Sequence, residues 1–391
     1  MSHGAGFWLI AAAFLTAMAF STVPTPLWAL YQLQNGLSTF TVTVVFAMYA
    51  LGVVVSLFLA GHISDWLGRR RVLLPAVLIE AASAALFLSS TSLPVLIVAR
   101  VVSGLGVGMI TATATAHLAE LHLAARPTTD RTRSDVVATA ANLGGLAVGP
   151  LVSGLLAQYV ADPLRTPYLV FLILLVLSAV GVALVPETVE LAEERPPYRP
   201  QRVKVPAASR PLYLAAAAAA LAAFSVLGLF TSLAPGFVAG TMHHPSRVLA
   251  GLVTFLVFGT AAATQVALTR LTARQQLASG LLLMSAGIVG ITAAVWLPHL
   301  GLFLVAGVIT GAGAGTLFRG TVATVASVAP HRARGEALAG LFLAAYLGLA
   351  VPVVGVGLAT RFVSDPVALL GFTTALLMVN AAVSTRLLRR R

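Results

Sequence analysis

The chain has 391 residues, of which 59% are hydrophobic and only 9% charged, and it contains no cysteine. Because soluble proteins carry about 25% charged residues, this composition excludes a water-soluble globule. The absent cysteines exclude disulfide scaffolds and thiol-metal sites. The net charge of +12 indicates either a nucleic-acid partner or a membrane protein with basic inner loops.

Continuous apolar runs predict twelve membrane-spanning helices, since a span needs about 20 residues. In the first half the runs cover residues 7–30, 39–60, 72–91, 94–117, 135–158 and 166–185. In the second half they cover residues 212–237, 247–269, 276–297, 300–324, 335–359 and 366–387. We therefore expect an all-α membrane protein.

The basic residues predict how these helices are oriented. With a cytoplasmic N-terminus, 19 of the 24 basic residues fall in inner loops or the C-terminal tail, and only Arg165, Arg247 and Arg361 fall outside. This matches the rule that Lys and Arg collect on cytoplasmic loops, so both termini are expected inside. Charge spread over many short loops excludes nucleic acid as a partner. The preference for arginine over lysine is typical of GC-rich bacterial genes, so we expect a bacterial inner-membrane protein. Separately, we expect it to be a monomer.

The loop between the second and third spans reads Gly61-His62-Ile63-Ser64-Asp65-Trp66-Leu67-Gly68-Arg69-Arg70-Arg71. Gly61 lets a neighbouring helix approach closely, and Gly68 permits a tight turn. Asp65 can accept hydrogen bonds from the N-terminus of another helix, where the dipole favours an anion. An arginine-rich turn that only sets the topology is the alternative, but it explains neither Asp65 nor the glycines.

Glu80 is the only acid well inside a predicted span. At the helical rise it lies about 12 Å from the inner membrane surface. A lone carboxyl at that depth is expected to be protonated or hydrogen-bonded. Whether it carries a proton or has a structural role stays open.

Arg100 lies within the fourth span, where an arginine is costly enough to be a functional candidate. The helical rise places it about 9 Å below the outer surface, level with Phe20, Ser21 and Thr22 in the first span. The residues four positions after Phe20 and Thr22 are prolines without an N–H, so both carbonyls are left as acceptors for the guanidinium. A purely structural clamp is the alternative to a role in transport.

The fifth span contains Gly145-Leu146-Ala147-Val148-Gly149-Pro150-Leu151-Val152-Ser153-Gly154. Small residues four apart let two helices approach closely, and a proline bends a helix. Gly145, Gly149, Pro150 and Gly154 are therefore expected to form a close helix contact.

A proline-rich polar segment at 186–210 reads as a cytoplasmic linker between bundles at 1–185 and 211–391. The halves repeat: Phe20-Ser21-Thr22-Val23 matches Phe230-Thr231-Ser232-Leu233, and Ser103-Gly104-Leu105-Gly106-Val107-Gly108 matches Thr310-Gly311-Ala312-Gly313-Ala314-Gly315. Chance apolar similarity is the alternative. A true repeat predicts two pseudo-symmetric six-helix bundles with the substrate cavity between them near mid-membrane, and Thr231 and Ser232 beside it.

Three motifs resemble those of the major facilitator superfamily. The loop is similar to its signature Gly-x-Leu-x-Asp-x-x-Gly-Arg-Arg, with Ile63 in place of leucine. Arg100 to Gly106 resembles the fourth-helix motif Arg-x-x-x-Gly-x-Gly. The fifth span resembles the motif Gly-x-x-x-Gly-Pro-x-x-Gly-Gly of the drug–proton antiporter branch, with Ser153 replacing one glycine.

The resemblance implies a conformational latch on the cytoplasmic side. In the family the aspartate corresponding to Asp65 contacts the start of the eleventh helix, here near residues 334–337, in the outward-facing state. Glu120 matches an acidic position that in the family pairs with an arginine of the loop motif, here Arg69 or Arg70.

For function, the resemblance implies proton-coupled export of moderately apolar small molecules by alternating access, and no enzymatic activity. The aromatic and hydroxyl side chains along the expected cavity suit a neutral or cationic solute. Many such antiporters carry an acid in the first helix, and this chain has none there, so the position of a proton carrier stays open, with Glu80 as one candidate. A sugar or metabolite transporter is the main alternative. A polytopic membrane enzyme is remote, because no His, Asp or Glu cluster, cofactor motif or Walker A loop is visible.

Overall fold

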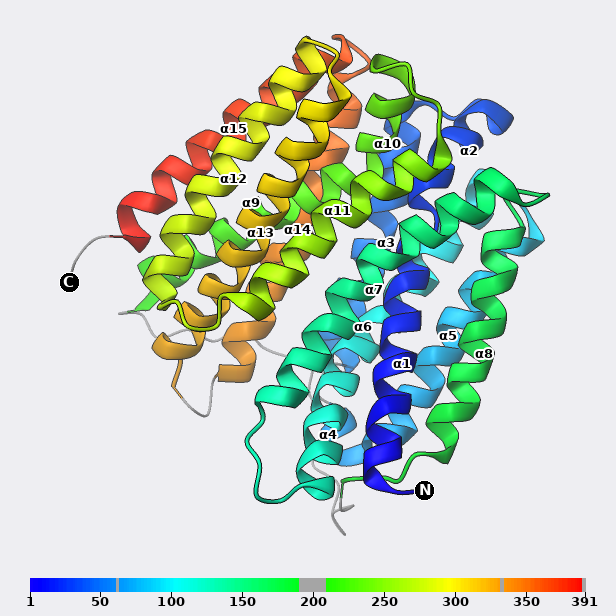
Figure 1. The fold of residues 1–391 in the computed structure, drawn as a ribbon, viewed down its shortest axis with the longest axis vertical. Coiled ribbons are helices and arrows are strands. Elements are labelled where there is room, and N and C mark those ends of the chain that lie inside the picture. Colours follow the sequence, from blue (N-terminus) through cyan, green and yellow to red (C-terminus); the bar gives the residue numbers. More distant parts are fainter. Residues whose placement is uncertain (61–62, 190–208, 331–333, 389–391) are drawn as a thin grey trace. The chain divides into compact units, whose positions relative to one another are not determined.

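The computed structural model describes residues 1–60, 63–189, 209–330 and 334–388, and the chain is helical along most of them (Figure 1). Within these residues, twelve helices are long and apolar enough to cross a membrane, which confirms the predicted all-α membrane fold. Helices are the expected solution in lipid, because each pairs its own backbone N–H and C=O groups. Gly61 and most of the predicted linker lie outside the described residues.

The first half contains six of the spans, within the elements α1 to α8, and three short elements, η1, α2 and α4. Their bounds are α1 (His3–Thr22), η1 (Thr25–Leu27), α2 (Trp28–Asn35), α3 (Thr39–Ala60), α4 (Ser64–Leu67), α5 (Arg69–Ser89), α6 (Leu93–Ala125), α7 (Thr132–Tyr159) and α8 (Thr166–Leu184).

The second half contains the spans α9 and α11 to α15. Its elements are α9 (Arg210–Ser232), α10 (Ala234–Gly236), the π-helical turn η3 (Phe237–Thr241), α11 (Arg247–Ala267), α12 (Ala273–Trp296), α13 (Leu300–Val328), α14 (Arg334–Ala359) and α15 (Asp365–Leu387).

The first predicted span, 7–30, is not one continuous helix. It ends at Thr22, passes through a 3₁₀ turn and resumes as α2. Pro24 and Pro26 lack the N–H groups that an α-helix would need at these positions, so the chain changes its hydrogen-bonding pattern there.

The described residues belong to two compact units. The first comprises Met1–Pro24 and Met48–Gln201, and the second Thr25–Ala47 and Arg202–Arg391. The predicted division at residues 186–210 stays a prediction. It differs from these units in that Thr25–Ala47, which we call the outer arm, belongs to the second unit.

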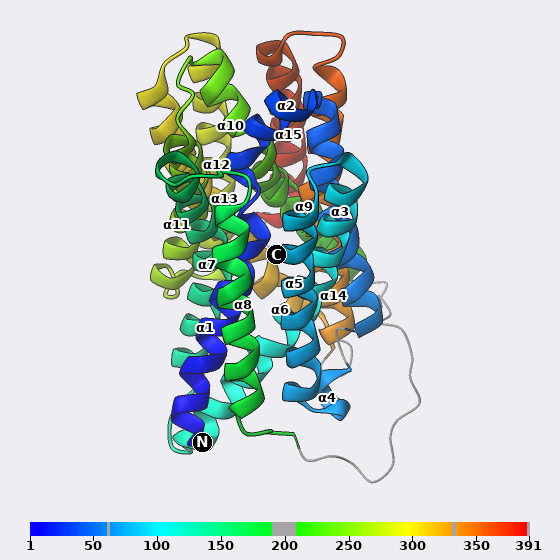
Figure 2. The same cartoon turned by 90° about the vertical axis from the view of Figure 1, so that its right-hand side faces the viewer.

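In the first unit α1 packs against α6, α7 and α8, and α5 packs against α6 and α8. Figure 2 shows α1 and α8 side by side. In the second unit α9 packs against α13, α14 and α15, and α13 against α11 and α12. The outer arm packs there too: η1 contacts α11, α2 contacts α10, and the Arg361 guanidinium lies 5.1 Å from the centre of the Phe40 ring.

Glycines set how closely these helices approach. A Cβ atom on Gly348 of α14 would overlap the Leu221 carbonyl of α9, whereas a Cβ on Gly355 of the same helix would meet nothing within 4 Å. Close approach of backbones replaces the hydrophobic driving force that lipid does not supply.

We therefore expect Gly348→Ala to destabilise the protein by about 1–3 kcal/mol, the usual range for overpacking. Gly355→Ala is the matched control on α14 and should leave the melting temperature nearly unchanged. Thermal unfolding of the purified protein, followed by intrinsic fluorescence, measures both. Equal melting temperatures for the two variants would contradict this account of the α9–α14 contact.

Candidate functional site

Arg100 of α6 links three spans of the first unit. Its side chain is buried, and its Nη1 donates to the Ser21 carbonyl of α1 over 2.7 Å. The guanidinium carbon lies 4.5 Å from the centre of the Tyr49 ring on α3, a distance typical of a cation–π contact.

The carbonyl that Arg100 binds differs from the two that the prolines had suggested. The Phe20 carbonyl accepts instead from the Val23 N–H over 3.0 Å. Because α1 ends at Thr22, the Ser21 carbonyl belongs to its last turn, where carbonyls lack helical partners. The ring of Phe20 packs near Phe87 and Phe171, with centroids 6.4 Å away in both cases.

Glu80 of α5 is fully buried against α6. Ser103 Oγ donates to its Oε2 over 3.1 Å, while Oε1 makes no hydrogen bond within the described residues. Gly106 leaves the space that this carboxyl occupies, since a Cβ there would lie 2.5 Å from Oε1. Arg100 and Ser103 are three residues apart on α6 and share a face, so that face carries both the cation and the donor to the acid.

A second polar cluster surrounds Arg69 at the start of α5. Nη2 donates to Glu120 Oε1 over 2.8 Å, and Nη1 donates to Asp65 Oδ1 over 2.5 Å and to Ser64 Oγ over 2.8 Å. Of the two arginines considered for Glu120, the pair is formed by Arg69. The Asp65 side chain remains 64% exposed, so its ion pair contributes little to stability.

Glu187, just past α8, completes this cluster. It accepts the N–H groups of Arg69 over 2.8 Å and Arg70 over 3.1 Å, which places an anion at the N-terminus of α5. Gly68 makes room for it: its φ is +102°, and a Cβ would lie 2.5 Å from Glu187 Oε2. Thr188 Oγ1 donates to Glu120 over 2.5 Å.

The sequence pattern places Glu187 in the linker and does not predict that it binds the N-terminus of α5. The available signal was an acid directly after the sixth span, on the same predicted membrane side as the unpaired N–H groups that open the third.

The fifth-span motif forms the contact between α7 and α1. A Cβ on Gly145 would lie 2.6 Å from the Leu15 carbonyl, and one on Gly149 would overlap the Ala19 carbonyl. Ser153 Oγ donates to the Val23 carbonyl over 2.8 Å. Pro150 lies inside α7, and both it and Gly154 are buried.

The hydroxyls of Thr231 and Ser232 at the end of α9 bind their own helix. Thr231 Oγ1 donates to Leu227 O over 2.9 Å, and Ser232 Oγ donates to Gly228 O over 2.8 Å. The repeat aligns Arg100 with Gly307, so this half has no guanidinium at the corresponding position.

Replacing Glu187 with glutamine should weaken the cap of α5 by about 0.5–2 kcal/mol, as for other helix caps. We expect faster hydrogen exchange at the amides of Arg69 and Arg70. Asp130→Asn removes an acid from an exposed loop and serves as the control. Unchanged exchange in Glu187→Gln would show that the carboxylate does not hold this helix start.

Two curated relatives share short stretches with the chain. It is 39% identical over 113 residues to the major facilitator-type transporter psiT2 of Psilocybe cyanescens, covering 28% of this chain and 20% of that protein. It is 40% identical over 73 residues to the arabinose-proton symporter of Bacillus subtilis, covering 19% of this chain and 16% of the symporter. The matches thus span a fifth or less of these relatives.

The fold is similar to that of a D-xylose-proton symporter, with a TM-score of 0.74 and 15% sequence identity. The match covers 96% of this chain and 95% of that one. Residues 9–351 match the family described as the Major Facilitator Superfamily. The chain therefore belongs to the Major Facilitator Superfamily and is a multi-pass membrane protein with the fold of that family.

Proposed function

We propose that the chain exports moderately apolar small molecules, neutral or cationic, in exchange for protons by alternating access. The observation that carries this proposal is the contact of the glycine motif of α7 with α1. That motif resembles one typical of the antiporter branch. At its glycines, Gly145 and Gly149, the backbone of α7 comes so close to α1 that a Cβ atom would meet an α1 carbonyl.

Glu80 is the proton carrier in this proposal. Its carboxyl is buried, has one oxygen free of hydrogen bonds within the described residues, and lies beside the α6 face that carries Arg100. Arg100 itself keeps its proton under physiological conditions. It contributes a fixed positive charge and a link to α1 through the Ser21 carbonyl.

The setting we propose is a bacterial inner membrane, with both termini cytoplasmic and a monomeric transporter. The support is the concentration of basic residues in alternate loops. Under this orientation the Arg69 cluster lies on the cytoplasmic side, where Asp65, exposed and held by one ion pair, acts as the conformational latch.

Proton-coupled sugar or metabolite transport is the second candidate. The local identity with the arabinose-proton symporter of Bacillus subtilis favours it. It makes the same use of Glu80 but predicts a hydroxyl-rich solute moving inward with the proton.

The test of the main proposal is ethidium transport by the purified protein in liposomes, with and without an imposed pH gradient. Wild-type transport should rise with the gradient, and Glu80→Gln should transport at the same rate with and without it. Asp130→Asn is the charge-matched control and should respond as wild type does. Gradient-driven arabinose uptake without ethidium transport would replace export with the second candidate, and an unaltered response in Glu80→Gln would remove Glu80 from the mechanism.

Asp65→Asn should weaken the outward-facing state while leaving the melting temperature nearly unchanged, because the side chain is exposed. Since the chain has no cysteine, engineered cysteine pairs across the cytoplasmic side report this directly through their crosslinking yield. Equal yields in Asp65→Asn and in the wild-type background would rule the latch out.

A further inference from the structure

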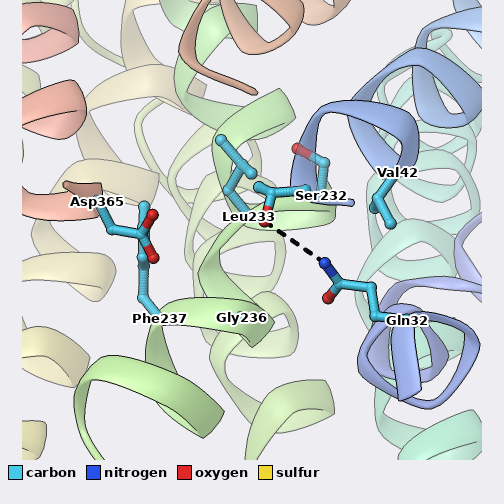
Figure 3. A pocket seen from close by; sticks show the side chains of 8 residues that line it. Gln32, Val42, Ser232, Leu233, Gly236, Phe237 and Asp365 are labelled. Carbon is cyan, nitrogen blue, oxygen red and sulfur yellow. Dashed lines mark hydrogen bonds between the residues drawn. The ribbon is translucent and has the colours of Figure 1, made fainter. Parts of the chain in front are cut away.

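A polar cavity of about 110 Å³ lies within the second unit (Figure 3). Its residues come from α2, α3, α9, α10, α15 and the turn η3. Of these, α2 and the first part of α3 belong to the outer arm. Its lining residues are Gln32, Thr39, Val42, Ser232, Leu233, Gly236, Phe237 and Asp365.

The cavity carries one negative charge, from Asp365 at the start of α15. This side chain is half-buried, and no ion pair involves it within the part of the chain that the structure describes. The nearby Arg361 does not neutralise it, since that guanidinium lies over the Phe40 ring instead. The carboxylate therefore faces the cavity without a partner cation.

Neutral oxygens come from the other helices. Ser232 is 4% exposed, and its hydroxyl donates to Gly228 O, which leaves its oxygen lone pairs for a ligand. Gln32 Nε2 lies 3.5 Å from Thr39 Oγ1, so its amide oxygen is not used in that contact. Figure 3 shows Asp365 and Gln32 on opposite sides of the cavity.

The two halves of the repeat differ in the charge near the ends of their first helices, α1 and α9. Ser232 aligns with Thr22 at the end of α1, beside which Arg100 supplies a buried cation. The second half has Gly307 at the position of Arg100, and the cavity that Ser232 lines also contains an acid, Asp365. Where the first half carries its own cation, the second leaves a negatively charged cavity.

We propose that this cavity binds a small monovalent cation, with Asp365 supplying the charge and Gln32, Thr39 and Ser232 supplying neutral oxygens. A single carboxylate balances one positive charge, and oxygen ligands suit hard cations. The volume exceeds the roughly 10–15 Å³ that one water requires, so it can hold an ion together with waters or an ammonium group.

The cation has two sources, a free alkali ion or the ammonium group of a transported solute. Binding of an ammonium group rests on the proposed export of cationic solutes, whereas binding of a free alkali ion does not. Binding is measured without transport, so a failure here leaves the export proposal standing, and a failure of export leaves this site standing.

The experiment is a thermal titration of the purified full chain in nanodiscs of zwitterionic lipid. NaCl or methylammonium chloride replaces N-methylglucamine chloride at constant ionic strength. We expect a saturable rise in melting temperature with at least one of these two cations. A response to Na⁺ assigns the site to free ions, and a response to methylammonium alone assigns it to ammonium groups.

Asp365→Asn should weaken the apparent affinity at least tenfold. Asp162→Asn, which removes an exposed acid from the loop between α7 and α8, is the matched control and should titrate as wild type does. Thr39→Val removes one oxygen ligand while keeping the charge, and should weaken the affinity by a smaller factor. The proposal is overturned if neither cation gives a saturable shift, or if Asp365→Asn and Thr39→Val both titrate as wild type does.

Discussion

The close approach of α6 to its neighbours, made possible by a stripe of glycines, is the contact on which the first unit depends. A Cβ on Gly104 would overlap the Tyr49 carbonyl of α3. A Cβ on Gly108 would lie 2.8 Å from the Cβ of Ser56, which is also on α3. Gly106, between them, faces α5 and the Glu80 carboxyl. Since lipid supplies no hydrophobic drive for helix association, packing of this kind holds the helices together. Ser103, on the same helix, donates to this buried acid.

The second half uses the corresponding glycines in the same way. Gly311 and Gly315 of α13 face the Val257 and Ala261 carbonyls of α11, and Gly313 faces the Met284 backbone of α12. Alternate glycines thus serve alternate neighbours in both halves, which supports a true repeat over chance apolar similarity. The polar groups are not repeated. Gly307 stands in place of Arg100, and Gly313 faces the Met284 backbone where Gly106 faces the Glu80 carboxyl. The two halves share a packing scheme but not a chemistry.

The fold could be predicted from the sequence because each membrane span is a local run of about 20 apolar residues. Continuous apolar runs suffice to place the spans, although they do not show that the first span breaks after Thr22. What local pattern could not predict depended on tertiary contacts. Glu187 caps a helix more than a hundred residues earlier in the chain, and Arg100 binds the Ser21 carbonyl because α1 ends at Thr22 rather than continuing to the prolines. The cavity at Asp365 needs five separate α-helices and the turn η3 to meet, and no single motif signals it.

We propose that Gly106, in the glycine stripe of α6, makes room for the Glu80 carboxyl, and that this carboxyl gives transport its response to pH. Gly106→Ala and Gly313→Ala, compared in liposomes across a range of pH, test it most directly. Both substitutions crowd a neighbouring helix, so both should lower stability, but only the Cβ at position 106 would meet an acid, Glu80. The account predicts an altered pH profile of transport in Gly106→Ala and a wild-type profile in Gly313→Ala. Identical profiles in the two variants would contradict it.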